Sequence, residues 1–196
     1  VYIGPNCIIG FPPEDKSIFP RTPFSVHICS GTQITGNVTI DAGTIKTTYI
    51  GKDCFLMKGV HTGHDSIIGD KVTIAPHAII GGHVEIMEGA TLGMGCIIHQ
   101  RQKIWHYCMI GMGTIVPRKL AIQPFSTYFG NPAKKIGLNA VGIEKNGIDE
   151  TTVASIQKLF DEILSNSVDE HRRSDSLFNI TEINVSVSTD GTICIE

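Results

Sequence analysis

Residues 67–98 read IIGDKVTIAPHAIIGGHVEIMEGATLGMGCII, and an aliphatic side chain recurs there at every sixth position. The same period extends from Val26 to Val116, where thirteen of sixteen positions are aliphatic and the other three are Thr. An α-helix repeats about every 3.6 residues and a lone strand about every 2, so a sustained period of six predicts a parallel β-helix built from hexapeptides. The predicted inward ladder is Val26, Thr32, Val38, Thr44, Ile50, Leu56, Thr62, Ile68, Ile74, Ile80, Ile86, Leu92, Ile98, Ile104, Ile110 and Val116.

A second set of positions supports this register. Glycine often follows the aliphatic residue, as at Gly51, Gly69 and Gly81, where we expect a bend to require a permissive backbone. Three hexads should make one triangular coil, so stacked coils would bury a core that no single rung could bury. The fourth residue after each aliphatic is small, as a tight corner requires: Cys54, Val60, Ser66, Val72, Ala78, Val84, Ala90, Cys96, Cys108 and Thr114.

The bulk composition narrows the classes of function. A net charge of −3 with 18% charged residues provides no basic patch, so we expect no nucleic-acid partner. The sequence contains neither an apolar run of membrane-spanning length nor a visible signal peptide, and we expect no membrane span. Of the six cysteines, Cys7, Cys54, Cys96 and Cys108 fall on the small-residue positions and need no redox role. We therefore expect a cytoplasmic protein.

Breaks in the period divide the chain. We predict a hexapeptide-repeat β-helix over 1–120, with a Pro-rich loop at 11–25, and a C-terminal extension over 121–196. Within the extension, an apolar face predicts a helix at about 150–165, which Asp149 or Thr151 can cap. Alternation on both sides of Asp190-Gly191 predicts a short hairpin at about 181–196. The predicted class is all-β with a C-terminal α appendage.

Histidines are concentrated between His61 and His99, in the middle of the predicted β-helix. His64 lies two places after ladder residue Thr62, so its side chain should point outward. Gly82 should lie one coil above His64, and Gln100 one coil above Gly82. A neutral imidazole, a backbone amide and a side-chain amide would then share one column, as a general base beside an oxyanion donor would. Surface histidines without a role remain the alternative for each residue taken singly.

Four segments together carry a resemblance to a known family. They are HTGHDSIIGD at 61–70, GGHVEI at 81–86, HQ at 99–100 and GNPAKKIGLNAVGIEKNG at 130–147. They resemble the UDP-N-acetylglucosamine O-acyltransferases of lipid A synthesis. That family implies a left-handed parallel β-helix that forms a homotrimer, with active sites in the clefts between subunits.

The resemblance also implies roles for individual residues. His64 matches the catalytic base, Asp65 would orient its imidazole, and Gly82 matches the backbone oxyanion donor. A groove along the subunit boundary would receive the acyl tail, and Met94 and Met112 share an outward column there. The remaining residues match substrate contacts: Asp15 for the sugar from the neighbouring subunit, His61 and His83 for the sugar and acyl ester, and His99, Gln100, Asn139 and Lys145 for the nucleotide.

The chain departs from the family at several points. Asp41-Ala42-Gly43-Thr44 stands where His-Arg-Gly-Thr is usual, and Lys145-Asn146 stands where two basic residues are usual. Val141 replaces an acidic residue, two residues are added near Ala121–Pro124, and one helix with a hairpin replaces a C-terminal helical bundle. These departures concern the nucleotide and the sugar, whose identities the sequence leaves open, and they do not touch the three catalytic positions.

The resulting hypothesis is an acyltransferase that moves an acyl group to a hydroxyl or amine of a nucleotide-linked sugar. The donor would be a thioester of acyl carrier protein or of coenzyme A, and neither a permanently bound cofactor nor a metal is expected. Three alternatives remain open. The first is an acetyl-coenzyme A-dependent amino-sugar N-acetyltransferase. The second is a zinc enzyme of the carbonic anhydrase kind. Such enzymes use two histidines five residues apart, whereas the close pair in this chain, His61 and His64, is three residues apart. The third is a non-catalytic trimeric scaffold, which would not need His64 beside Gly82.

Overall fold

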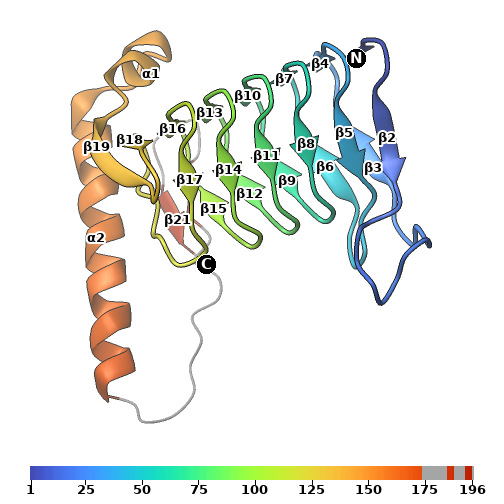
Figure 1. The fold of residues 1–196 in the computed structure, drawn as a ribbon. Coiled ribbons are helices and arrows are strands. Elements are labelled where there is room, and N and C mark those ends of the chain that lie inside the picture. Colours follow the sequence, from blue (N-terminus) through green and yellow to red (C-terminus); the bar gives the residue numbers. More distant parts are fainter. Residues whose placement is uncertain (174–184, 188–192, 196) are drawn as a thin grey trace. The chain divides into compact units, whose positions relative to one another are not determined.

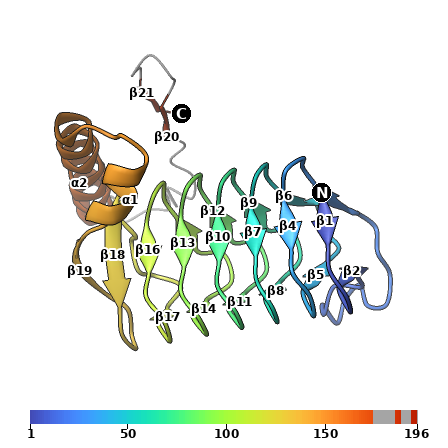
Figure 2. The same cartoon turned by 90° about the horizontal axis from the view of Figure 1, so that it is seen from above.

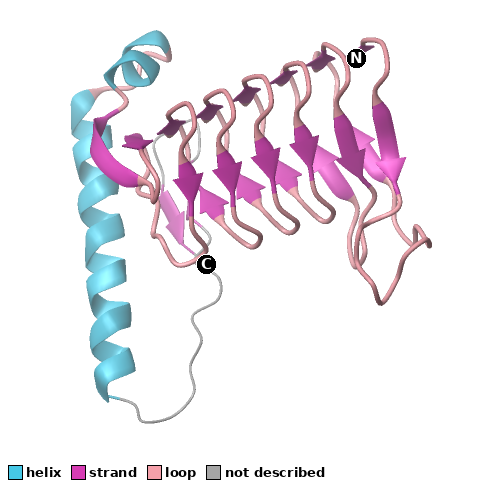
Figure 3. Ribbon diagram, viewed as in Figure 1, coloured by secondary structure: helices cyan, strands magenta, loops and turns pink. Residues whose placement is uncertain are grey.

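The computed structural model describes residues 1–173, 185–187 and 193–195, and the chain divides into two compact units, Val1–Asn146 and Gly147–Glu196. The first unit is a parallel β-helix in which short strands stack coil upon coil (Figure 1). Figure 3 shows the same unit as alternating strands and turns, with helix appearing only after the last coil.

Three sheets form the walls of the β-helix, and Figure 2 shows the strands of one wall following one another along the coil axis. Sheet A contains β1 (Tyr2–Ile3), β4 (Gln33–Ile34), β7 (Phe55–Leu56), β10 (Thr73–Ile74), β13 (Thr91–Leu92), β16 (Met109–Ile110), β18 (Ser126–Phe129) and β19 (Lys134–Leu138). Sheet B contains β2 (Ile8–Phe11), β5 (Thr39–Asp41), β8 (His61–Thr62), β11 (Ile79–Ile80), β14 (Ile97–Ile98) and β17 (Ile115–Val116). Sheet C contains β3 (Val26–Ile28), β6 (Thr48–Ile50), β9 (Ile67–Ile68), β12 (Glu85–Ile86) and β15 (Lys103–Ile104).

The predicted ladder is confirmed from Ile50 onward. Ile68, Ile86 and Ile104 are register partners on successive coils, three hexads apart as expected. Every ladder residue from Ile50 to Val116 is at most 1% exposed. Burying each such aliphatic side chain contributes about 1.5–3 kcal/mol before the entropy of ordering the chain is subtracted. Inward side chains from the three walls therefore form one continuous core, aliphatic except at Thr62, of the kind that the period of six predicts.

The predicted ladder is wrong before Ile50. The residue paired with Ile50 is Ile28, and those paired with Leu56 and Thr62 are Ile34 and Ile40. The four predicted positions are Val26, Thr32, Val38 and Thr44, and each lies off the inward column. The reason is a longer connection between β5 and β6, the 42–47 loop, which adds four residues to one coil and shifts the period.

The reason given for the recurrent glycines is also wrong. Gly69 and Gly81 do not adopt positive φ. Instead, a Cβ at Gly69 would lie 2.8 Å from the amide nitrogen of Glu88, and one at Gly81 would lie 2.6 Å from that of Gln100. These glycines allow successive coils to approach closely. The left-handed bend falls two residues later in the hexad, at Asp53, Asp65, Lys71, His77, His83, Arg101 and Tyr107, with φ between 53° and 61°.

The first unit continues past residue 120, where the sequence predicted a domain boundary. β18 pairs in parallel with β16, with Ile110 opposite Tyr128, and β19 then pairs antiparallel with β18. These strands extend sheet A, so residues 126–138 remain part of the β-helix unit. Helix α1 (Ala140–Lys145) follows, and the Asn139 side chain accepts a hydrogen bond from the Gly142 amide as its N-cap.

In the second unit, α2 spans Glu150–Arg173, eight residues beyond the end expected from the sequence. Asp149 caps its N-terminus, because the Asp149 carboxylate accepts a hydrogen bond from the Thr152 amide at 2.8 Å. Strands β20 (Val185–Val187) and β21 (Ile193–Ile195) pair antiparallel, as the predicted hairpin requires, while its Asp190-Gly191 turn lies outside the described residues. No helix in the described ranges is both long and apolar enough to cross a membrane.

Candidate active site

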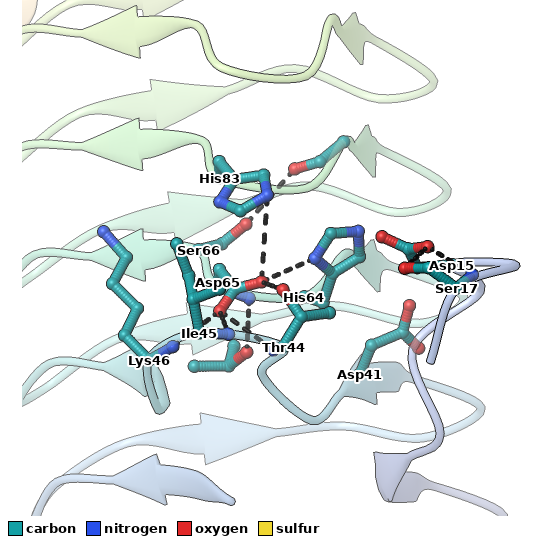
Figure 4. Close-up of polar contacts among 12 residues, drawn as sticks. Asp15, Ser17, Asp41, Thr44, Ile45, Lys46, His64, Asp65, Ser66 and His83 are labelled. Carbon is teal, nitrogen blue, oxygen red and sulfur yellow. Dashed lines mark hydrogen bonds and ion pairs between the residues drawn. The ribbon is translucent and has the colours of Figure 1, made fainter. Parts of the chain in front are cut away.

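The site is built on the coil corner that follows β8. His64 and Asp65 come directly after this strand, and Asp65 occupies the left-handed position of the corner, with φ 59°. Asp tolerates this conformation better than most residues. The tight turn directs the Asp65 carboxylate inward under the 42–47 loop while His64 remains at the surface (Figure 4).

Asp65 is fully buried and almost saturated with hydrogen bonds. Its Oδ1 accepts from the backbone amides of Thr44, Ile45 and Lys46, each at 2.9 Å, and its Oδ2 accepts from the Thr44 hydroxyl at 2.6 Å. Burial raises the pKa of this carboxyl, but these donors and His64 outweigh it and hold the pKa well below its usual range. The inserted 42–47 loop therefore keeps an anion beneath His64.

His64 is oriented by that anion. Its Nδ1 lies 2.6 Å from Asp65 Oδ2 and must donate, because an ionised carboxylate can only accept. Nε2 then carries the lone pair of the neutral ring, and it makes no hydrogen bond to any described residue. The His64 side chain is 17% exposed, so Nε2 remains accessible to an incoming proton donor.

Two glycines shape the space around Nε2. A Cβ at Gly82 would lie 2.7 Å from His64 Nε2, so the imidazole packs directly against this residue. A Cβ at Gly63 would lie 2.7 Å from the Gly82 nitrogen, so any side chain at Gly63 would cover that amide. Within the described residues, the Gly82 N–H donates no hydrogen bond. The column of His64 and Gly82 predicted from the sequence is present, and Gly63 is a contributor that the sequence analysis missed.

His83 closes the other side of the imidazole. The rings of His64 and His83 meet edge to face, 5.0 Å between centroids, and His83 Nε2 lies 3.8 Å from Asp65 Oδ2. Burial lowers the pKa of His83, and repulsion from Arg101 reinforces this against the attraction of Asp65. The lowered pKa favours the neutral form of His83, in which the ring can both donate and accept hydrogen bonds.

An acidic side faces this histidine pair. Figure 4 shows Asp15, from the loop between β2 and β3, beside His64 in the same chain. The Asp15 carboxylate accepts hydrogen bonds from the Ser17 amide at 2.8 Å and hydroxyl at 2.6 Å, which lower its pKa. Asp41 ends β5 and lies 3.9 Å from His61 Nε2, while His61 Nδ1 bonds the Thr39 hydroxyl at 2.8 Å. Asp41, which in the sequence stands out only as a departure from the family pattern, thus lies beside a residue expected to contact the substrate.

The other candidate residues lie elsewhere on the first unit. His99 and Gln100 occupy the coil above Gly82, and the His99 ring bonds the Gln100 carbonyl at 2.9 Å. Asn139 caps α1 and donates to the Tyr107 carbonyl at 2.8 Å, and Lys145 lies in the last turn of α1. The coils of β11, β14 and β17 separate these two residues from the His64 corner, so a single chain does not bring them to it.

Met94 and Met112 are 52% and 59% exposed, and they lie on successive coils because Leu92 and Ile110, two residues before them, are register partners. Both therefore occupy the outward column that the sequence predicts.

Potential ligand atoms of His64, Asp65 and His83 lie within 4.8 Å of one another, close enough to consider a metal ion. However, both Asp65 oxygens already accept hydrogen bonds, and His64 directs its Nδ1–H at this carboxylate. A cation would have to displace those donors. The arrangement suits an oriented imidazole better than a zinc ligand set, which would present free histidine nitrogens to an open site.

Two family models match the chain. Residues 47–82 match the bacterial transferase hexapeptide (six repeats), and residues 122–187 match domain 2 of UDP N-acetylglucosamine O-acyltransferase. Over these two segments the chain is similar to bacterial hexapeptide-repeat transferases and to the UDP-N-acetylglucosamine O-acyltransferases. Over 76 residues the chain is 29% identical to the acyl-[acyl-carrier-protein]–UDP-N-acetylglucosamine O-acyltransferase of Alkalilimnicola ehrlichii. That match covers 39% of the chain and only 29% of the length of the Alkalilimnicola protein.

Solved structures of UDP-N-acetylglucosamine acyltransferases share the fold of this chain. The enzyme from Bacteroides fragilis superimposes with a TM-score of 0.75 at 23% identity, covering 91% of this chain and 72% of that one. The enzyme from Campylobacter jejuni gives 0.70 at 28% identity, covering 87% and 68%. The predicted fold, a left-handed parallel β-helix followed by a helix and a hairpin, is confirmed.

Proposed function

We propose that the protein transfers an acyl group from an acyl thioester to a hydroxyl or amine of a nucleotide-linked sugar, with His64 as the general base. The observation that carries the proposal is the pairing of His64 Nδ1 with Asp65 at 2.6 Å, which leaves Nε2 open beside Gly82. The His64 imidazole can then take a proton only through Nε2, and this atom lies beside the Gly82 N–H, a backbone donor that can bind an oxyanion.

The proposed reaction uses these groups in order. His64 Nε2 removes the acceptor's proton as its oxygen or nitrogen attacks the thioester carbonyl carbon. The Gly82 N–H donates to the oxyanion that forms, while ionised Asp65 stabilises the imidazolium. The tetrahedral intermediate then collapses, the carbon–sulfur bond breaks, and the sulfur leaves with the proton from His64. His83 and His61 would hold the acceptor and the acyl ester.

The donor and acceptor are proposed from the relatives. Those matched are named for acyl-[acyl-carrier-protein] and UDP-N-acetylglucosamine. We infer an acyl carrier protein thioester as donor, with coenzyme A as the alternative, and a nucleotide sugar as acceptor, within lipid A synthesis. His99, Gln100, Asn139 and Lys145 would contact the nucleotide.

A homotrimer is part of the proposal. His64 lies on an outer wall, and a deep substrate cleft there requires a neighbouring subunit. Ile79 and Ile97, which are 46% and 39% exposed, are register partners on the outward face of sheet B and offer apolar surface for such a contact. Cyclic symmetry would supply three identical clefts. A stable, active monomer in sedimentation experiments would contradict this part.

His64→Ala tests the function. Product formation from acyl carrier protein and coenzyme A thioesters with UDP-N-acetylglucosamine should be followed by mass spectrometry. We expect kcat to fall about 10²–10⁴-fold without loss of fold, because a positioned general base contributes that much. His77→Asn is the control, since His77 is exposed at another corner. Near-normal turnover in His64→Ala would place the base elsewhere.

A further inference from the structure

Thr44 is the one residue in the described part of the chain that donates to both oxygens of the Asp65 carboxylate. Its amide nitrogen lies 2.9 Å from Oδ1, and its hydroxyl oxygen lies 2.6 Å from Oδ2. The amides of Ile45 and Lys46 donate to Oδ1 alone. His64 contacts Oδ2 alone, through Nδ1 at 2.6 Å. Thr44 and His64 therefore share one acceptor oxygen, the one that orients the imidazole.

Two points of contact define the plane of the Asp65 carboxylate. The terminal torsion of an aspartate side chain has broad minima, so donors on Oδ1 alone would leave Oδ2 free to swing. Apart from His64, the Thr44 hydroxyl is the only donor to Oδ2 among the described residues. His83 Nε2 lies 3.8 Å from this oxygen, beyond the length of a hydrogen bond. Thr44 thus sets the direction in which Oδ2 meets His64 Nδ1.

The loop that carries Thr44 closes tightly over this carboxylate (Figure 4). A Cβ at Gly43 would clash with the Lys46 carbonyl oxygen and would lie 3.1 Å from Asp65 Oδ1, so the loop closes only with glycine there. Just past the loop, the Thr48 hydroxyl accepts a hydrogen bond from the Asp65 amide at 2.9 Å. Both ends of the 42–47 loop therefore hold Asp65, Thr44 by its side chain and Thr48 by its backbone.

The contact between the Thr44 hydroxyl and Asp65 is a strong one. Hydroxyl donors approach an ionised carboxylate to about 2.5–2.7 Å, closer than they approach a neutral acceptor. Burial raises the pKa of Asp65, and the Thr44 hydroxyl is the strongest of the donors that bring this pKa below its usual range. Thr44 is itself buried, so water does not compete freely for this hydrogen bond.

We propose that Thr44 is a positioning residue for acyl transfer. By holding both oxygens of Asp65 it fixes the plane of the carboxylate, and through it the orientation and the proton position of the His64 ring. This inference rests on the proposed function, in which His64 is the base. It assigns a role to a threonine that the period of six places wrongly in the inward ladder.

Steady-state kinetics of Thr44→Val measure this role. Valine has the shape of threonine without the hydroxyl, so the variant keeps the amide contact to Oδ1 and loses the contact to Oδ2. We expect kcat to fall about 10- to 100-fold with little change in KM, because a small displacement of a catalytic group costs that much. Thr44→Ser restores the donor and should stay within about threefold of the wild type.

Thr32→Val is the matched control. Thr32 is also buried, in the turn before β4, where its hydroxyl donates to the Gly51 carbonyl at 2.7 Å and accepts from the Cys54 amide at 3.1 Å. The variant should lower the melting temperature at least as much as Thr44→Val does, yet leave kcat within about threefold of the wild type. The comparison separates a loss of stability from a loss of orientation.

Nitrogen NMR of protein labelled at its histidines reads the tautomer without any substrate. The spectra are recorded at a pH where the imidazoles are neutral, and His64→Ala identifies the His64 signals. We expect the ring proton on Nδ1 in the wild type and in Thr44→Ser. Thr44→Val should show a mixture of both neutral tautomers, which a role in packing alone would not produce.

The inference is overturned if Thr44→Val keeps the wild-type tautomer or near-normal kcat. It is also overturned if Thr44→Ser does not restore turnover, or if Thr32→Val loses as much. Should Thr44→Val not fold, Thr44→Cys takes its place, because a thiol donates only weakly, and the same change of tautomer is expected. If the wild type acylates no nucleotide sugar, the proposed function fails, and the NMR comparison still decides whether Thr44 orients His64.

Discussion

Replacing Asp65 with Asn tests the coupling between the 42–47 loop and the catalytic imidazole. The substitution preserves the size of the side chain, and Asn tolerates the left-handed backbone at this corner, where φ is 59°. What changes is the charge and one acceptor oxygen. Asp65 Oδ1 accepts hydrogen bonds from three backbone amides, and Oδ2 accepts from the Thr44 hydroxyl and from His64. An Asn side chain has only one acceptor oxygen, so it cannot accept from all five donors in the same way.

The cost in stability follows from this bonding. The Asn oxygen should continue to accept from the three loop amides, because a backbone N–H can only donate. The Thr44 hydroxyl and His64 Nδ1 can each accept a hydrogen bond instead, so they can face the Asn NH2 group. Four hydrogen bonds from neutral donors then lose the assistance of a charge, about 1 kcal/mol each at most. We expect the free energy of unfolding to fall by about 2 to 4 kcal/mol, since the loop is exposed at Ile45 and can relax there in part.

The catalytic effect should be larger. The Asn amide now donates toward His64 Nδ1, which must accept, so the ring proton moves to Nε2. An imidazole protonated at Nε2 cannot remove a proton from the acceptor. Loss of the orienting carboxylate in a catalytic triad costs about 10⁴-fold in kcat, and we expect a decrease of about 10³–10⁴-fold here with little change in KM.

Urea unfolding and steady-state kinetics measure the two effects. Asp53→Asn is the matched control, because Asp53 occupies the same left-handed corner position but is exposed, and it should change stability by no more than about 0.5 kcal/mol. The reasoning is refuted if Asp65→Asn unfolds like the wild type, or if it keeps near-normal kcat. In the latter case His64 does not depend on Asp65 for its tautomer.

Substitutions at three other positions of the first unit test further parts of the reasoning. Gly82→Ala places a methyl group 2.7 Å from His64 Nε2 and should lower kcat about 100-fold while the fold is unchanged. Kinetics measure kcat and circular dichroism measures the fold. Full activity would mean that the His64 ring can be displaced without loss of catalysis. Met112→Gly should open the proposed groove and shift the preferred donor to longer chains, about fourfold per methylene at about 0.8 kcal/mol each; an unchanged profile over a series of acyl lengths excludes Met112 from that role. Burial lowers the pKa of His106, so the unfolded state binds more protons below about pH 6.5 and stability should fall as pH decreases from there. His106→Gln should flatten the dependence of the melting temperature between pH 7.5 and 5.5, and a dependence equal to that of the wild type would assign it to other groups.

The period of six predicted the fold and its core because each coil of a β-helix repeats the same inward position. From Ile50 to Val116 the spacing is uniform, and the pattern alone sufficed. Before Ile50 the pattern was misread because Thr32 and Val38 are also buried, at corners, and imitate ladder residues. The signal that could have corrected the register was Ile28, Ile34 and Ile40, also six apart but offset by four residues from the later ladder.

Part of the site could likewise be predicted. His64 and Gly82 share a column because residues three hexads apart must stack, and the structure brings the imidazole against the glycine. Asp65 was expected beside His64 because it follows it in the chain. What holds Asp65 was not foreseen, because its donors come from the 42–47 loop, whose four extra residues break the period on which the prediction depended.

The sequence by itself determined the architecture and the outward placement of His64, because stacking in a β-helix converts linear spacing into position. The tertiary structure decided the chemistry of the site. Contacts between coils hold the pKa of Asp65 low, place the ring proton of His64 on Nδ1 and lower the pKa of His83. Such properties depend on burial and on donors from distant parts of the chain, which a local pattern does not encode.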